Sequence, residues 1–96
     1  LDLKNQIGTM KRIAEMISQS QNKSALIAIH DINIAAKFAD RILLMHDGKI
    51  VSNGTPSEVL TAKNIATVFG VTCQIIPVIN ERPMRILIED EIREEE

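Results

Sequence analysis

The sequence predicts an α/β fold: a short mixed sheet with flanking helices and a C-terminal β-hairpin. Residues 25–29, Ala-Leu-Ile-Ala-Ile, form an apolar run typical of a strand buried in a parallel sheet. Residues 3–20 carry apolar side chains every three or four positions, which indicates an amphipathic helix. The pair Asp47-Gly48 lies between two strand-like runs and predicts a hairpin turn.

The N-terminal helix has a start signal and a weakness. Asp2 precedes it, and an aspartate at that position can accept hydrogen bonds from the free backbone amides of the first turn. Gly8 lies inside the helix and costs about 1 kcal/mol relative to alanine. We therefore expect this helix to need tertiary packing.

A strand–helix–strand unit is predicted next. The apolar run 25–29 ends at His30, and Asp31 can cap a short helix over residues 32–39. Residues 41–45 form a second apolar strand. Such a unit is expected to be right-handed, with the two strands parallel.

Residues 50–53 are expected to return antiparallel after the Asp47-Gly48 turn. Thr55, Pro56 and Glu58 then form a capping-box pattern that starts a helix reaching about residue 62. A second helix over residues 63–69 is expected to end at Gly70 in the left-handed conformation.

Two strands, residues 71–79 and 84–88, are expected to form the C-terminal hairpin around a turn at residues 80–83. Pro77 favours an edge or a bulge in the first of them. The acidic tail, residues 89–96, is predicted to be a solvated, frayed end.

Composition restricts the classes of function. The first 88 of the 96 residues carry a net charge of +3 and the last eight carry −5, giving −2 overall. Basic residues are scattered and Tyr and Trp are absent, so nucleic-acid binding is disfavoured.

The single cysteine, Cys73, lies in an apolar run and is interpreted as a buried, inert thiol. No apolar run approaches the roughly 20 residues of a membrane span. The chain does not begin with methionine and opens directly on helix-like sequence, so we expect a piece of a longer protein.

His30 is the candidate catalytic residue, because reactive groups gather at the carboxyl ends of strands in open α/β sheets. Its imidazole could donate a hydrogen bond to a phosphate or to an activated water. The alternative interpretation is a core histidine whose hydrogen bonds are satisfied within the fold. A metal site is disfavoured because His46 lies in a predicted turn and no metal-ligand spacing is present. A Ser-His-Asp triad is also unsupported, since no Gly-x-Ser-x-Gly motif occurs.

Several of these motifs, in the same order and spacing, resemble the ATP-binding cassette (ABC) ATPases. They are Leu1-Asp2, the apolar strand ending in His30-Asp31, Arg41-Ile-Leu-Leu-Met-His-Asp-Gly-Lys-Ile50, and Gly54-Thr-Pro-Ser-Glu-Val-Leu60. The resemblance covers residues 1–70 and the last third of the family's nucleotide-binding domain. It implies the C-terminal part of a P-loop NTPase fold, with residues 71–88 as a hairpin extension and 89–96 as the acidic tail.

The resemblance also implies roles for two residues. Asp2 matches the aspartate that ends the D-loop, which touches a second cassette across bound ATP, so Asp2 and His30 are the expected cofactor-binding residues. His30 is similar to the switch histidine that contacts the γ-phosphate and helps to position the attacking water. The family's P-loop, glutamine loop, Leu-Ser-Gly-Gly-Gln stretch, magnesium aspartate and catalytic glutamate have no counterpart here. ATP and Mg²⁺ are therefore expected only in the full-length protein, and this fragment is expected to be inactive.

Residues 68–71, Val-Phe-Gly-Val, followed by two strands, resemble cassettes that energise iron-siderophore, haem and cobalamin importers. The implied partners are transmembrane permease subunits and a second cassette, on the cytoplasmic face of the membrane. The fragment itself is expected to self-associate through the apolar edge at residues 25–29. The alternative is a free-standing α/β interaction module without catalysis, in which Asp2 and His30 are structural.

Overall fold

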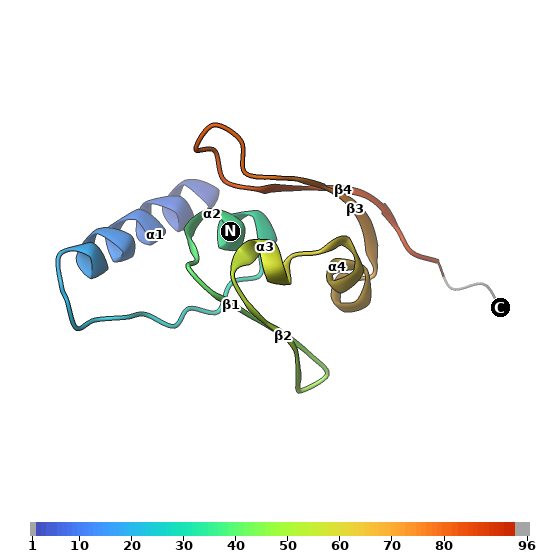
Figure 1. Ribbon diagram of the computed structural model, residues 1–96, viewed down its shortest axis with the longest axis horizontal. Helices are drawn as coiled ribbons and strands as arrows, with labels where there is room; N and C mark the ends of the chain where they lie inside the picture. The colour runs from blue at the N-terminus through green and yellow to red at the C-terminus, as the bar shows by residue number, and fades with distance from the viewer. Residues whose placement is uncertain (1, 94–96) are drawn as a thin grey trace. The chain divides into compact units, whose positions relative to one another are not determined.

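The computed structural model describes residues 2–93, and the chain divides into two compact units, Leu1–His30 and Asp31–Glu96 (Figure 1). Leu1 and the last three residues of the acidic tail lie outside the described residues. None of the described helices has the length and apolar character needed to cross a membrane.

The first unit begins with the predicted helix, α1 (Leu3–Ser18), drawn in blue in Figure 1. Asp2 is its N-cap, as predicted, and one carboxylate oxygen accepts a hydrogen bond from the backbone N–H of Lys4 at 3.0 Å. No residue of α1 is buried, although its apolar residues lie on one face. Its apolar face therefore gains little burial within this unit, and the structure does not show the tertiary packing that this helix was expected to need.

The predicted strand at residues 25–29 is wrong. This segment is extended but belongs to no strand, and Leu26 is 95% exposed. A strand forms only where a neighbouring strand takes up its backbone N–H and C=O groups, and no described strand pairs with this run. The parallel pairing with residues 41–45, and with it the mixed sheet, is absent from the part of the chain that the structure describes. Neither of the last two strands pairs with this run; they form a two-stranded sheet with each other.

The second unit opens with α2 (Ile32–Phe38), capped as predicted by Asp31, whose carboxylate accepts from the backbone N–H groups of Asn33 and Ile34. The hairpin of β1 (Ile42–His46) and β2 (Lys49–Gly54) follows. Asp47 and Gly48 form its turn, with φ angles of 51° and 74°. Two successive positive φ angles are characteristic of a type I′ turn, which confirms the predicted hairpin.

Two short helices follow, α3 (Pro56–Val59) and α4 (Ala62–Phe69). The predicted capping box is confirmed: the Thr55 side chain accepts from the N–H of Glu58, and the Glu58 carboxylate accepts from the N–H of Thr55. Gly70 ends α4 in the left-handed conformation, with φ of 69°, also as predicted. Helix α3 is shorter than predicted: it ends at Val59 rather than near residue 62.

The C-terminal hairpin consists of β3 (Val71–Ile76) and β4 (Arg85–Glu91), paired antiparallel (Figure 1). β3 ends just before Pro77, which has no N–H to donate to a partner strand. β4 runs three residues further than predicted and takes in Glu89, Asp90 and Glu91. This part of the acidic tail is strand rather than a frayed end, because its backbone lies opposite the start of β3.

The core of the second unit lies between α2, the two short helices and the C-terminal hairpin. Its buried cluster consists of Ala36, Leu60, Ile65, Met84 and Ile86. Partly buried side chains from β1, from β3 and from the start of α2 pack against it. Elements far apart in the sequence, α2 and β4 among them, are thus joined in one apolar core.

Candidate functional site

The two residues predicted to face a nucleotide lie at the ends of the first unit. Asp2 is exposed and caps α1. His30 is exposed and follows the extended apolar segment at a bend. Among the described residues, no hydrogen bond or ion pair involves the His30 side chain, and none joins it to Asp2. The structure therefore leaves His30 accessible to a ligand but does not bring these two residues together.

The core interpretation of His30 predicts a buried ring with satisfied hydrogen bonds. The exposed ring disagrees with that interpretation. Its neighbour Asp31 is the N-cap of α2, and its carboxylate accepts hydrogen bonds from two backbone N–H groups. The adjacent His30 and Asp31 therefore have different roles in the structure: a free imidazole and a structural carboxylate.

The other histidine, His46, ends β1 and lies 3.5 Å from the carboxylate of Asp47 in the hairpin turn. Both side chains are exposed, that of Asp47 more than that of His46. In the described part of the chain, no group of three or more His, Cys, Asp or Glu residues could hold a metal ion. His46 and Asp47 thus form a surface pair at the turn.

Cys73 lies in β3 and packs against the core cluster. Desolvation by burial raises the pKa of its thiol, and the nearby carboxylate of Glu89 raises it further. A thiol with a raised pKa forms little of the nucleophilic thiolate at neutral pH. Cys73 is only partly buried, rather than buried as predicted, but the raised pKa of its thiol agrees with the interpretation of an inert thiol.

Asn33 is a residue whose role the sequence did not reveal. It lies in the first turn of α2, and its side-chain amide hydrogen-bonds both the N–H and the C=O of Ile86 in β4. The two residues are 53 positions apart, so no local pattern could have indicated the contact. Beside it, an open hollow of about 340 Å³ is lined by Lys37, Arg85 and mostly apolar neighbours.

Comparison with known proteins shows which proteins the chain is similar to. No family model matches the chain. Curated ATP-binding proteins of ABC transporters, however, align with about four fifths of it at 36–43% identity. The chain is related by sequence to the ATP-binding proteins of ABC transporters, as its motifs predict.

Particular relatives are hemin import ATP-binding proteins. HmuV of Photobacterium damselae subsp. damselae is 43% identical over 76 residues, which are 79% of this chain and 28% of that protein. HmuV of Bordetella avium is 36% identical over 77 residues, or 80% of this chain and 29% of the relative. An uncharacterized ABC transporter ATP-binding protein of Methanocaldococcus jannaschii is 41% identical over 75 residues, or 78% and 29%. The chain spans less than a third of the length of these curated relatives.

Proposed function

We propose that the chain is the C-terminal part of the ATP-binding subunit of an ABC importer. In that subunit, ATP binding and hydrolysis would drive the import of haem or of a related iron-siderophore or cobalamin. The proposal is carried by the similarity to hemin import ATP-binding proteins over about four fifths of the chain. The fold it implies is the C-terminal part of a P-loop NTPase, to which the β1–β2 hairpin and the two capped helices would belong.

His30 is the proposed catalytic residue. No described residue makes a hydrogen bond to its exposed imidazole. The ring is therefore free to donate a hydrogen bond to the γ-phosphate and to orient the attacking water. Phosphoryl transfer depends on such positioning and on charge stabilisation more than on covalent chemistry by the protein. Asp2 is proposed to contact a second copy of the subunit across the bound nucleotide.

The described residues do not by themselves fit Mg²⁺-ATP. They offer no cluster of metal-ligating side chains, and the sequence has no glycine-rich phosphate loop with its lysine. We therefore propose that nucleotide and Mg²⁺ are held mainly by parts of the protein outside this chain, and that the chain alone is inactive. Its proposed partners are permease subunits and a second ATP-binding subunit, at the cytoplasmic face of the membrane.

The test is His30→Ala in the intact protein, with ATP turnover and ATP binding measured separately. Turnover is expected to fall by about 10²–10⁴-fold, the usual contribution of a positioned acid–base group, with binding largely retained. His46→Ala is the matched control, because His46 is the second histidine and lies at an exposed turn. Wild-type turnover in the His30 variant would refute the proposed role.

A further inference from the structure

The outer edge of β4, the edge that faces away from β3, is occupied at Ile86 by a side chain. The Asn33 amide nitrogen donates to the Ile86 carbonyl at 3.0 Å, and the Ile86 N–H donates to the Asn33 oxygen at 2.7 Å. A strand added at this edge would offer the same donor and acceptor. The amide of Asn33 thus takes the place of one residue of a neighbouring strand.

The register of the hairpin shows which other residues of β4 face outward. In antiparallel strands, residues alternate between bonding the partner strand and facing away from it. The backbone N–H and C=O of Ile86 point away from β3, so those of Ile88 do too. The register shifts between Thr72 and Cys73, which leaves Glu89 as an extra residue on β4. Beyond this bulge, the Ile92 N–H donates inward to the Gly70 carbonyl at 2.8 Å, so Glu91 faces outward.

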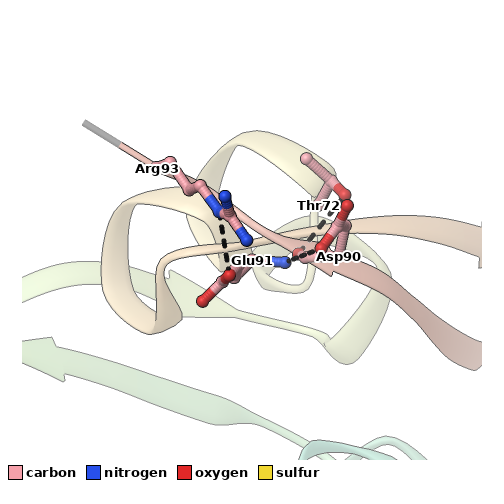
Figure 2. Close-up of polar contacts among 4 residues, drawn as sticks. All are labelled: Thr72, Asp90, Glu91 and Arg93. Carbon is pink, nitrogen blue, oxygen red and sulfur yellow. Dashed lines mark hydrogen bonds and ion pairs between the residues drawn. The ribbon is translucent and has the colours of Figure 1, made fainter. Parts of the chain in front are cut away.

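Glu91, too, is capped by a side chain. Its outward N–H donates to the carboxylate of Asp90 at 2.8 Å, as Figure 2 shows. Figure 2 also shows two neighbouring contacts. The Arg93 Nε lies 3.0 Å from the Glu91 carboxylate, and the Thr72 hydroxyl donates a hydrogen bond to the Asp90 carbonyl. Among the described residues, both backbone groups of Ile86 are capped, Glu91 is capped at its N–H alone, and Ile88 has no side-chain cap. The Ile88 side chain is 52% exposed.

We propose that Asn33 and Asp90 close the outer edge of β4 and so keep a second copy of this chain from adding a strand there. Edge strands with free backbone groups are templates for pairing, and proteins protect them with charges, bulges and covering groups. β4 has all three: the acidic run Glu89–Glu91, the bulge at Glu89, and the two side-chain caps. This role does not depend on nucleotide or transport.

The experiment opens the edge and detects pairing at its centre. The reporter background is Cys73→Ser with Ile88→Cys, because residue 73 lies opposite residue 88 and two cysteines there could bond within one chain. Asn33→Ala and Asp90→Ala are added singly and together. Mass is measured by light scattering, and oxidative cross-linking at position 88 reports pairing of two β4 edges. We expect the double variant to dimerise at least about tenfold more tightly than the background and to cross-link.

Two matched controls separate capping from other effects. Asn64→Ala removes another asparagine that donates to a backbone carbonyl, that of Val59 at 2.8 Å, away from any strand edge. Asp90→Asn removes the charge but keeps the oxygen that accepts from Glu91. Asn64→Ala should behave as the background does. Asp90→Asn, which keeps the cap but lowers the negative charge of the edge, should associate less than Asp90→Ala. Mass and cross-linking equal to the background in both the double variant and Asp90→Ala would overturn the proposal. So would a control that associates as tightly as the double variant, or a gain in association over the background without cross-linking at position 88.

Discussion

The side-chain amide of Asn33 binds both backbone polar groups of Ile86 and so joins the first turn of α2 to β4. Ile86 is only 2% exposed and belongs to the core cluster. Only a group that both donates and accepts in one plane satisfies the two bonds at once. The contact is therefore sensitive to a change of a single atom in the side chain.

Asn33→Asp is expected to destabilise the chain at neutral pH by about 1–3 kcal/mol and to recover in acid. An ionised carboxylate cannot donate to the Ile86 carbonyl, whereas a protonated carboxyl can both donate and accept. The pKa of the introduced carboxyl is therefore higher in the folded than in the unfolded chain. Its stabilising bonds are present below the unfolded value of about 3.9 and are lost as pH rises through the folded value.

Urea unfolding of Asn33→Asp and wild type, followed as a function of pH, measures this difference. Asn33→Ala is the control, because it cannot regain the bonds, so its difference from wild type should not change with pH. A pH-independent deficit in Asn33→Asp would contradict the prediction, because it would show that a protonated carboxyl does not restore the two bonds to Ile86.

The capping box of α3 predicts a pH dependence of a second kind. The pKa of Glu58 lies below its usual value, mainly because the backbone N–H of Thr55 donates to its carboxylate. A lowered pKa contributes stability above the unfolded value, and this stability is lost as pH falls through the folded value. Glu58→Gln keeps an oxygen for Thr55 but does not titrate. Unfolding curves of the two proteins should therefore converge on acidification, and parallel curves would contradict the prediction.

Alanine at two glycines is expected to act in opposite directions. Gly70 has a φ of 69°, so Gly70→Ala should destabilise the second unit by about 1 kcal/mol. Gly8 lies inside α1, and a methyl group added there would meet only the flexible end of the Arg12 side chain, at 3.8 Å. Gly8→Ala should therefore strengthen α1 by roughly 0.5–1 kcal/mol. Thermal unfolding followed by circular dichroism tests both signs, and equal effects of the two substitutions would refute the argument.

The isolated chain is expected neither to hydrolyse nor to hold Mg-ATP. One histidine and one aspartate at the ends of the first unit cannot replace a nest of backbone amides and a lysine around the phosphates. Calorimetric titration should show no heat of binding. An affinity in the micromolar range would contradict the proposal that the nucleotide is held mainly elsewhere.

Self-association of the chain is expected to depend on residues 25–29. This extended run exposes Leu26 at 95%, and its backbone has no partner strand among the described residues. Leu26→Lys should lower the association seen by light scattering. Val78→Lys is the matched control, since Val78 is 60% exposed in the loop of the C-terminal hairpin. A clean monomer at high concentration in the unmodified chain would refute the expectation.

The candidate site was predictable in part. The motifs that contain Asp2 and His30 are contiguous in sequence, and ABC transporter ATP-binding proteins align with about four fifths of the chain, in agreement with the resemblance. What those two residues contact could not be predicted, because a site between elements is defined by the packing of those elements. In the described residues Asp2 caps its own helix and His30 stays free.

The sequence by itself determined the local structure. The caps at Asp2, Asp31 and Thr55, the turn at Asp47-Gly48 and the left-handed Gly70 all formed as predicted. Each depends on hydrogen bonds or backbone angles within about four residues, so a short stretch of chain contains all the groups involved.

Only the tertiary structure decided how the strands pair. Residues 25–29 have strong strand character yet form no strand, whereas the acidic residues Glu89–Glu91 have little and extend β4. The Asn33–Ile86 contact likewise joins segments far apart in the chain. A strand is stabilised by the backbone of its neighbour, and which neighbour is available is a property of the whole fold rather than of the strand's own residues.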